Sequence, residues 1–322
     1  MTSISSVLHE IEVGAPRRFG RLDVFPLFSR ASSTPYFLLL EEALAAKSVE
    51  VSETSEIGSV PVLELRSTAA FPILLLDGEE LVGAKQNRIL NTSVLAPAGK
   101  AIQLPVSCVE QGRWRYMSRT FKGADHALFA KARARKAGRM AMSFKARGAG
   151  MGSRHQSVAS AFDADQGAVW ADVSDKLARM KVRSASGAMK DGFDSYEINL
   201  SAFEEALAPV TGQTGAVFAL DGKVVGVEIL PTESAFRKLS RKLVRSYAID
   251  ALEETDAATP PAPSAADARS FLARVSSSGV RSAAGVGLGE DIRIEGERCV
   301  GHALIHDGVV LHLAAFDQAL AA

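Results

Sequence analysis

One short pattern occurs three times along the chain, and it limits the fold more than any other feature. In each copy an apolar run leads into an Asp-Gly pair and a second, largely apolar run follows; the pairs are Asp77-Gly78, Asp221-Gly222 and Asp307-Gly308. Asp-Gly supplies the positive φ angles that a two-residue type I′ turn requires. We therefore predict three β-hairpins, a positive φ angle at each glycine, and antiparallel sheets as the scaffold.

Helical patterns separate the three copies. Residues 124–144 are rich in alanine, with Asp125 as the candidate N-cap. Residues 165–180 place apolar side chains at helical spacing, and residues 236–252 combine an apolar stripe with a basic opposite face. The sequence therefore predicts an α+β fold, with antiparallel sheets built on Asp-Gly β-hairpins and amphipathic helices packed against them.

Two segments interrupt these patterns. Residues 145–161 contain three closely spaced glycines, and residues 253–268 are rich in proline and alanine, so we expect both to be mobile. We predict an α+β domain over residues 1–252, a linker or loop over 253–268, and a C-terminal helix plus hairpin over 269–322. This last unit should pack on the main domain and complete its sheet, because an isolated hairpin is only marginally stable.

Composition limits the class of protein. Hydrophobic residues make up 47% of the chain and charged residues 23%, with a net charge of zero, as in ordinary globular proteins. Cys108 and Cys299 are too few for a disulfide framework and have no metal-site spacing. The start has no signal-peptide pattern, and the longest apolar run is far shorter than the roughly 20 residues of a membrane span. We expect a cytoplasmic protein without a membrane partner.

Polar side chains concentrate between residues 77 and 114, within segments that otherwise resemble strands. If residues 79–93 form one strand, alternation places Glu80, Gln86 and Arg88 on the same face. Glu110 lies in the following predicted strand. Because burying such groups without partners costs free energy, we predict that these four residues converge on one concave site.

The residue types in this segment suggest roles. The candidate catalytic residues are Glu80, Glu110 and Arg88, two carboxylates for acid–base chemistry or metal binding and a guanidinium for phosphate. The candidate ligand-binding residues are Glu79, Gln86, Asn87, Asn91, Cys108, Arg113 and Trp114. The structural alternative is a polar network that ties a hairpin to a neighbouring helix. For Cys108, core packing is the better interpretation than a nucleophile.

Charge is unevenly distributed. Residues 113–154 contain twelve Lys or Arg against one acid, Asp125, and therefore carry +11. Contact with phosphate or nucleic acid is one interpretation, with Trp114, Tyr116 and Phe121 available for stacking. The other is intramolecular pairing with the acidic segment 41–80, which we favour. Two basic residues, Arg133 and Lys136, fall on the same helical side as apolar Phe129 and Met140, so the charge is not confined to one solvated face.

Two long phrases also carry a family resemblance. They are LLLDGEELVGAKQNRILNTS at residues 74–93 and LPVSCVEQGRW at residues 104–114, and the similarity extends over about residues 20–252. The sequence resembles the ARG and rhodanese-phosphatase-superfamily-associated protein domain, a family of unassigned activity. Its genes occur beside those of ADP-ribosylglycohydrolases and rhodanese-like phosphatases. The resemblance implies a role near ADP-ribose or NAD-derived metabolites, by association and without assigned catalytic residues.

The leading interpretation is a cytoplasmic protein that binds or processes a phosphate-bearing nucleotide, such as ADP-ribose or an NAD-related compound, in a polar pocket. The alternative is a non-enzymatic RNA-binding or protein-interaction module that uses the basic segment 113–154. The sequence leaves open whether the protein is an enzyme, which metal or cofactor it uses, and its oligomeric state.

Overall fold

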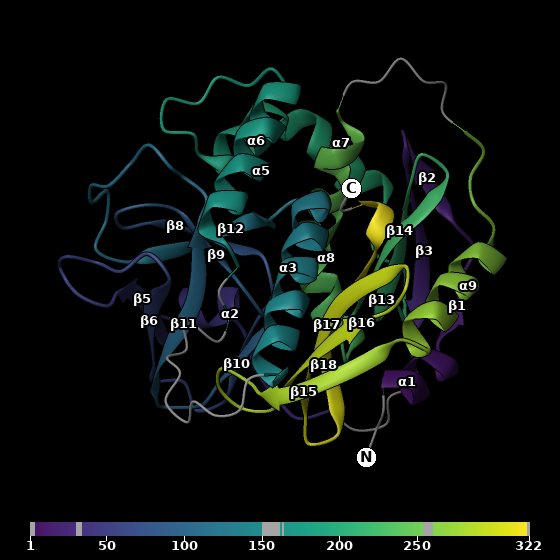
Figure 1. Ribbon diagram of the computed structural model, residues 1–322, viewed down its shortest axis with the longest axis horizontal. Coiled ribbons are helices and arrows are strands. Elements are labelled where there is room, and N and C mark those ends of the chain that lie inside the picture. Colours follow the sequence, from purple (N-terminus) through teal and green to yellow (C-terminus); the bar gives the residue numbers. More distant parts are fainter. Residues whose placement is uncertain (1–3, 30–33, 150–161, 163, 254–259, 321–322) are drawn as a thin grey trace.

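The computed structural model describes residues 4–29, 34–149, 162, 164–253 and 260–320 (Figure 1). Its strands form a nine-stranded, a six-stranded and a three-stranded sheet within these residues. The strand pairs are antiparallel apart from one parallel pair in the smallest sheet, and helices pack around the sheets. The α+β class predicted from the sequence is confirmed. No helix in the described ranges combines the length and apolarity that crossing a membrane requires.

The nine-stranded sheet combines strands from the N-terminal and the C-terminal parts of the chain. Its strand order is β1 (Glu12–Val13), β3 (Leu22–Phe28), β13 (Gly215–Leu220), β14 (Lys223–Ile229), β18 (Val309–Asp317), β17 (Cys299–His306), β16 (Glu290–Glu295) and β15 (Gly279–Ala284), with β2 (Arg17–Phe19) paired to β3. Strand β18 pairs with β14, as in the pair Gly226 and Phe316. The C-terminal strands therefore extend the same sheet that the N-terminal strands begin.

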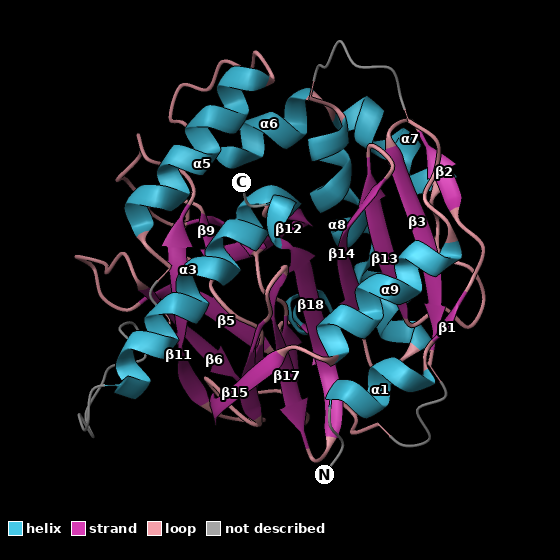
Figure 2. Cartoon of the chain, turned by 45° about the vertical axis from the view of Figure 1, so that its right-hand side comes forward, coloured by secondary structure: helices cyan, strands magenta, loops and turns pink. Residues whose placement is uncertain are grey.

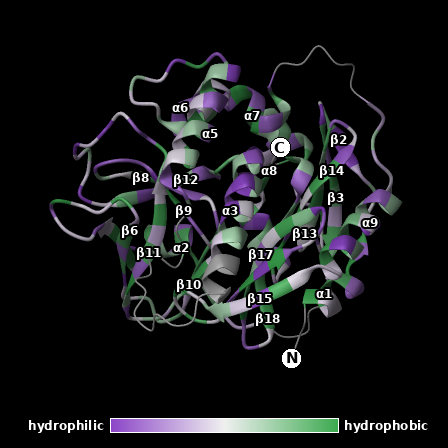
Figure 3. Cartoon of the chain, viewed as in Figure 1, coloured by the Kyte–Doolittle hydropathy of each residue, from purple (hydrophilic) through white to green (hydrophobic). Residues whose placement is uncertain are grey.

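Helices cover both faces of this sheet (Figure 2). On one face Phe25 and Val217 pack with α1 (Ile4–Glu10) and α9 (Ala265–Ser276). On the other face Val24 and Phe218 join a larger core, which includes residues of α3 (Ala130–Ala149), α5 (Gln166–Arg179), α6 (Met189–Ser195), α7 (Glu197–Ala206) and α8 (Glu233–Ala251). Alternation along the strands supplies these two apolar faces, and hydrophobic colour follows β13 and β17 in Figure 3.

The six-stranded sheet curls back toward itself. Its order is β12 (Phe121–Ala127), β8 (Glu79–Gly83), β9 (Arg88–Leu90), β11 (Ala101–Cys108), β6 (Val62–Ser67) and β5 (Val49–Glu53). A bridge between Ser52 and Thr120 brings its two outer strands together. Helix α2 (Leu40–Ala45) and the three-stranded sheet of β10 (Val94–Ala96), β7 (Ile73–Leu75) and β4 (Leu38–Leu39) pack into the same core.

Two of the three Asp-Gly hairpins are confirmed. Asp221 and Gly222 have φ angles of 50° and 71°, and they join the paired strands β13 and β14. Asp307 and Gly308, at 49° and 75°, join β17 and β18 in the same way. Both central residues of each turn therefore have the positive φ that a type I′ turn requires.

The first Asp-Gly hairpin prediction is wrong, although its glycine does have a positive φ of 80°. Strand β7 pairs with β10 and β4, whereas β8 pairs with β12 and β9. The chain therefore changes sheets at Asp77-Gly78. Asp77 is not among the positive-φ residues of the described chain, so the turn has one left-handed residue and does not direct β8 back along β7.

The helix predictions are confirmed in part. Helices α5 and α8 lie where the sequence places them, and Thr232 caps α8 by accepting a hydrogen bond from Ala235 N (3.1 Å). The predicted start of the Ala-rich helix is wrong, because residues 121–127 form β12 and Asp125 lies in that strand rather than at a cap. The expected loop at 145–161 is also partly wrong, since α3 continues to Ala149. Residues 150–161 and 254–259 lie outside the described residues.

Replacing Gly222 by valine should destabilise the protein by at least about 1–2 kcal/mol, the cost of a left-handed L-residue, with further loss from a clash. A Cβ atom there would lie 2.7 Å from the carbonyl oxygen of Pro261. Gly99→Val is the matched control, because Gly99 has a φ of 62° and a Cβ atom added to it would have no neighbour within 4 Å. Urea unfolding should rank Gly222→Val as the less stable variant, and equal midpoints would count against this account.

Candidate functional site

The polar segment after β8 is a tight turn rather than a continuous strand. Strand β8 ends at Gly83 and β9 begins at Arg88, with Glu80 paired to Ile89 across a short hairpin. Gly83 and Ala84 have φ angles of 132° and 39°. Strand alternation through residues 79–93 is therefore wrong as the reason for grouping Glu80, Gln86 and Arg88. Instead, the turn at residues 84–87 places Gln86 and Asn87 beside Glu110, which follows the end of β11.

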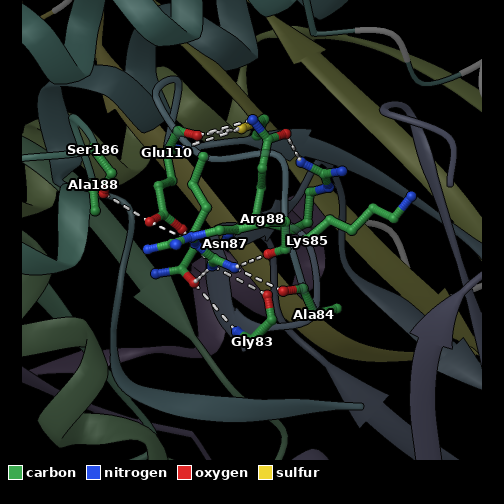
Figure 4. A network of polar contacts seen from close by, with 12 residues as sticks. Gly83, Ala84, Lys85, Asn87, Arg88, Glu110, Ser186 and Ala188 are labelled. Carbon is green, nitrogen blue, oxygen red and sulfur yellow. Dashed lines mark hydrogen bonds and ion pairs between the residues drawn. The ribbon is translucent and has the colours of Figure 1, made fainter. Parts of the chain in front are cut away.

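Glu110 is the centre of a hydrogen-bonded set, which we call the Glu110 network (Figure 4). Its Oε1 accepts hydrogen bonds from Ser186 Oγ (2.7 Å) and Arg113 Nε (2.8 Å). Its Oε2 accepts from the backbone N of Asn87 (3.0 Å) and from Arg113 Nη2 (2.5 Å). Arg113 also donates to the carbonyl of Ala84 (2.7 Å). The network therefore joins the 84–87 turn, the 111–119 loop and the segment that precedes α6.

Burial opposes ionisation of Glu110, but hydrogen bonds from Arg113, Ser186 and Asn87 outweigh it and hold the pKa of this carboxyl below its usual value. A carboxylate with four donors and a lowered pKa is a poor general acid, and its lone pairs are already used. The geometry thus favours a role for Glu110 in holding the three segments together.

Glu80 joins the same network through Asn87, whose Nδ2 donates to Glu80 Oε1 (3.0 Å). The other oxygen of Glu80 lies 2.5 Å from His126 Nε2, and His126 Nδ1 lies 3.2 Å from Asp125 Oδ1. Glu80 and His126 are buried, whereas the Asp125 side chain is 46% exposed. The His126 ring also stacks on Phe193. A chain of titratable groups therefore runs from the surface to the network.

Replacing His126 by glutamine should remove a pH-dependent part of the stability. Burial lowers the pKa of His126, but Glu80 and Asp125 outweigh burial and raise it above 6.5. A raised folded-state pKa stabilises the fold fully below the unfolded value near 6.5, and this contribution disappears as pH rises through the folded-state pKa. Urea unfolding should therefore show a gap between wild type and His126→Gln that is widest below pH 6.5 and narrows above it. A gap independent of pH would contradict the charged state of His126.

A second group lies on the other side of the turn, and we call it the Arg88 cluster: Arg88, Glu53, Gln86, Cys108 and Trp114. Arg88 Nη1 donates to Gln86 Oε1 (2.6 Å), and Gln86 Nε2 donates to the carbonyl of Glu110 (3.0 Å). Arg88 Nη2 lies 3.9 Å from Glu53 Oε1. In the part of the chain that the structure describes, Arg88 Nε, Arg88 Nη2 and Glu53 Oε2 are buried without a hydrogen-bond partner.

Trp114 covers this cluster. The Arg88 guanidinium lies 5.6 Å from the centre of the Trp114 ring, and the ammonium of Lys85 lies 5.2 Å from it. Trp114 is 48% exposed and stands on the 111–119 loop, most of which is exposed. The loop also carries Arg115 and Arg119 and no acidic residue. The cluster is thus a buried guanidinium beneath an exposed aromatic ring and a basic loop.

Cys108 is buried at the end of β11. Burial raises the pKa of its thiol, although Trp170 and Arg88 act in the opposite direction. A protonated, buried thiol is a weak nucleophile, which agrees with a packing role. The side chain of Gln166 holds the backbone here by accepting from Cys108 N (2.7 Å) and donating to its carbonyl (2.8 Å).

The structure brings together most but not all of the candidate residues. Glu80, Gln86, Asn87, Arg88, Cys108, Glu110, Arg113 and Trp114 belong to the two adjoining groups. Glu79 lies elsewhere, because its Oε1 accepts from Lys242 Nζ (2.6 Å). Asn91 also lies elsewhere, donating to the carbonyl of Phe162 (2.9 Å). The set fills a buried region rather than an open pocket. A groove of about 940 Å³ near α2 is lined by other residues.

A third polar group was not grouped by sequence reasoning. We call it the central charge cluster: Asp77, Arg133, Lys136, Glu228, His302 and His312, all of them buried. Arg133 Nη1 donates to Glu228 Oε1 (2.5 Å), and Lys136 pairs with Asp77. The signal that could have found it is the placement of Arg133 and Lys136 on the apolar side of their helix. No group of three metal-ligating side chains suited to a metal ion occurs among the described residues.

The basic segment 113–154 makes its described ion pairs within the molecule. Arg135 and Arg139 pair with Asp172, and Lys131 pairs with Glu253. Arg113, Arg133 and Lys136 also pair with acids of the same chain, so intramolecular pairing accounts for part of the positive charge of this segment. The expected acidic partner segment 41–80 supplies Asp77, whereas Glu228, Asp172 and Glu253 come from later in the sequence.

Comparison with known families gives one match. The family profile of the ARG and Rhodanese-Phosphatase-superfamily-associated Protein domain matches residues 10–316. The match includes residues 253–268, which the sequence resemblance left outside the family. Comparison with curated proteins and with solved structures gave no match. The match covers nearly the whole chain, and the protein therefore belongs to the ARG and Rhodanese-Phosphatase-superfamily-associated Protein domain family.

Proposed function

We propose that this protein binds a phosphate-bearing nucleotide of the ADP-ribose or NAD type at the Arg88 cluster. The observation that carries the proposal is the guanidinium of Arg88, which is fully buried yet has two nitrogens without a hydrogen-bond partner among the described residues. Buried polar groups of this kind are rare and call for an explanation, and a ligand that accepts hydrogen bonds is one.

The surroundings of Arg88 support this class of ligand. Trp114 and Tyr116, both 48% exposed, offer aromatic faces on which a nucleotide base can stack. Arg115 and Arg119 on the same loop supply positive charge for phosphate. The family name also points to ADP-ribosylglycohydrolases, which act near this chemistry.

Binding is better supported than acid–base catalysis by the two glutamates. All four hydrogen bonds of Glu110 go to protein groups, and both oxygens of Glu80 have protein partners. We therefore propose that Glu80 and Glu110 hold the turn and loops in position. The nucleic-acid alternative loses support, because the ion pairs of α3 use several of the charges that it requires.

The proposal is tested by titrating wild type with ADP-ribose, NAD and ADP by calorimetry at two salt concentrations. We expect saturable binding that Trp114→Ala and Arg88→Met each weaken by at least tenfold. Arg66→Met is the control, because Arg66 is exposed and pairs with Glu64 on the same sheet. Circular dichroism checks the fold, and Trp114→Ala, at an exposed position, keeps the test valid if Arg88→Met unfolds. Unchanged affinity in Trp114→Ala would overturn the site.

Salt dependence separates the two function classes. A ligand held by one or two phosphates loses little affinity between low and moderate salt, whereas a bound nucleic acid that contacts many phosphates loses several orders of magnitude. Tight, salt-sensitive binding of single-stranded RNA without nucleotide binding would favour the alternative.

A further inference from the structure

The six-stranded sheet curls round but does not close along its whole seam. Its outer strands β5 and β12 meet at one antiparallel bridge, between Ser52 and Thr120. Continued in the same register, this bridge would pair Val49 with Gly123. Among the described residues no such ladder forms, because β5 pairs with β6 and β12 pairs with β8. The two strands therefore part beyond the bridge, and each keeps an outer edge.

A groove of about 940 Å³ lies at this opening, and residues of both strands line it. Helix α2 borders the groove through Leu44 and Ala45. A Cβ atom added to Gly123 would lie 3.7 Å from Leu44 Cδ1, so the helix lies against the part of β12 that has no side chain. The opening is thus an existing space between two strand edges, with apolar groups of a helix beside it.

On β5 the edge that faces the groove has free backbone directions. Residues of an antiparallel strand alternate between bonding their neighbour and facing away from it. Thr68 N donates to the carbonyl of Ser48 (2.9 Å), so Ser48 faces β6. Val49 comes next and pairs with Ser67 without facing it. The backbone N–H and C=O of Val49 are therefore directed toward the outer edge.

Strand β12 shows the same arrangement on the opposite side of the groove. Gly83 pairs with Phe121, but its N–H donates to Asn87 Oδ1 (3.2 Å). Gly83 and Phe121 thus form a pair without mutual hydrogen bonds, and the backbone groups of Phe121 face outward. Gly123, two residues further along, faces outward as well. Both edges therefore present backbone donors and acceptors toward the groove.

The charged side chains of the groove favour an acidic guest. Lys47 and Lys122 line the groove and have no ion pair among the described residues, and Glu50 opposes them. The other two charges that line it are compensated, because Glu41 lies 2.8 Å from Lys242 and Arg66 lies 2.9 Å from Glu64. Two positive charges against one negative leave an excess of +1. Exposed ion pairs contribute little, so these charges set a preference and backbone pairing supplies the affinity.

From these features we propose that the groove binds an extended peptide segment of a partner protein, which adds a strand between β5 and β12. The segment pairs through its backbone with the edges at Val49 and Gly123, antiparallel to one strand and parallel to the other. Its apolar side chains contact Leu44, and an acidic side chain lies beside Lys122. The groove shares no residue with the Arg88 cluster, so this inference goes beyond the proposed function and does not depend on it.

The probe is a displayed library of random nonapeptides, selected on wild type and counter-selected on Ala45→Trp, in which the new ring fills the groove. We expect the enriched peptides to alternate apolar and polar residues, to carry net negative charge and to lack proline in the paired stretch. A synthetic copy of one enriched peptide should bind Ala45→Trp at least tenfold more weakly than wild type. Ala46→Trp is the control, because Ala46 is exposed at the end of the same helix and does not line the groove. No enrichment, or equal loss in both variants, would overturn the site.

Charge reversal gives a second test that leaves the groove open. Lys122→Glu should weaken the acidic peptide at least fivefold, since it places a negative charge beside the guest. Arg119→Glu is the control, an equal change of charge at an exposed position outside the groove. Circular dichroism checks the fold of each variant. Equal losses in the two variants would show attraction by net charge alone and would reject the proposed contact with Lys122.

Hydrogen exchange separates strand addition from docking through side chains. If the peptide adds a strand, the amides of Val49 and Gly123 should exchange at least tenfold more slowly in its presence. The amides of the 111–119 loop, which does not line the groove, should be unchanged. A peptide that binds in the groove but leaves the exchange of Val49 and Gly123 unaltered would reject backbone pairing.

Discussion

Replacing Arg133 by methionine is expected to lower the free energy of unfolding by about 3–5 kcal/mol, the range found when one partner of a buried ion pair is removed. Arg133 is fully buried in α3. Its Nη1 donates to Glu228 Oε1 (2.5 Å) and its Nε lies 3.4 Å from Asp77 Oδ2. Methionine keeps much of the apolar stem of the side chain but removes the positive charge that pairs with the buried carboxylates of Asp77 and Glu228.

The remaining partners show why the loss is large but finite. Glu228 still accepts hydrogen bonds from His312 Nε2 (3.0 Å) and Tyr247 OH (3.2 Å), and Asp77 keeps its pair with Lys136. Burial lowers the pKa of Lys136 to about 8, in spite of its pairing with Asp77. Lys136 therefore cannot fully replace the positive charge of Arg133 in this cluster.

Urea unfolding against Arg237→Met provides the measurement. Arg237 pairs with Glu233 on the exposed side of α8, and such a pair contributes only about 0.3–0.5 kcal/mol. Adding Glu228→Gln to Arg133→Met should recover part of the loss, because it removes one uncompensated charge. If Arg133→Met lowered the free energy of unfolding no more than Arg237→Met does, the buried ion pairs of Arg133 would be refuted.

The second large effect is expected for Glu110→Ala, with a loss of about 3 kcal/mol. Arg113 is 7% exposed and would lose its carboxylate, while Asn87 N and Ser186 Oγ would lose their acceptor. Arg113 keeps carbonyl partners such as Ala84, so the loss should lie near the lower end for a broken buried pair. Glu110→Gln retains an acceptor oxygen and should lose less.

This comparison also decides the role of Glu110. A structural role predicts that unfolding free energy falls in the order wild type, Glu110→Gln, Glu110→Ala, and that hydrogen exchange quickens in the 84–87 turn and the 111–119 loop. If Glu110 only contacted a ligand and did not stabilise the fold, both variants would have the unfolding free energy of wild type. Glu64→Gln, on the exposed part of the same sheet, calibrates the effect of removing a carboxylate.

Several elements were predictable because their signals are local. The hairpins at Asp221-Gly222 and Asp307-Gly308 follow from turn chemistry within four residues, and helix α8 follows from its apolar stripe and its cap at Thr232. The same kind of signal failed at Asp77-Gly78. There the turn residues are present, but the strands before and after the turn, β7 and β8, pair with other strands instead of with each other.

The candidate residues were found for a reason that the structure corrects. Polar density between residues 77 and 114 selected ten candidates, and eight of them lie in two adjoining groups. Strand alternation does not explain this grouping, because Gly83 and Ala84 turn the chain. Glu53 and His126, which complete these groups, come from strands β5 and β12, and no local pattern connects them to Arg88 or Glu80.

By itself, the sequence determined the α+β class, two hairpins, the helices α5 and α8, and the segment that carries the polar network. These depend on turn residues and periodicity, which act over a few neighbouring residues. Only the tertiary structure decided which charges pair, as Arg133 with Glu228 and Arg88 opposite Glu53. Such partners are distant in the sequence, 95 positions apart for Arg133 and Glu228, and the low dielectric of the interior selects them only after the sheets and helices have packed.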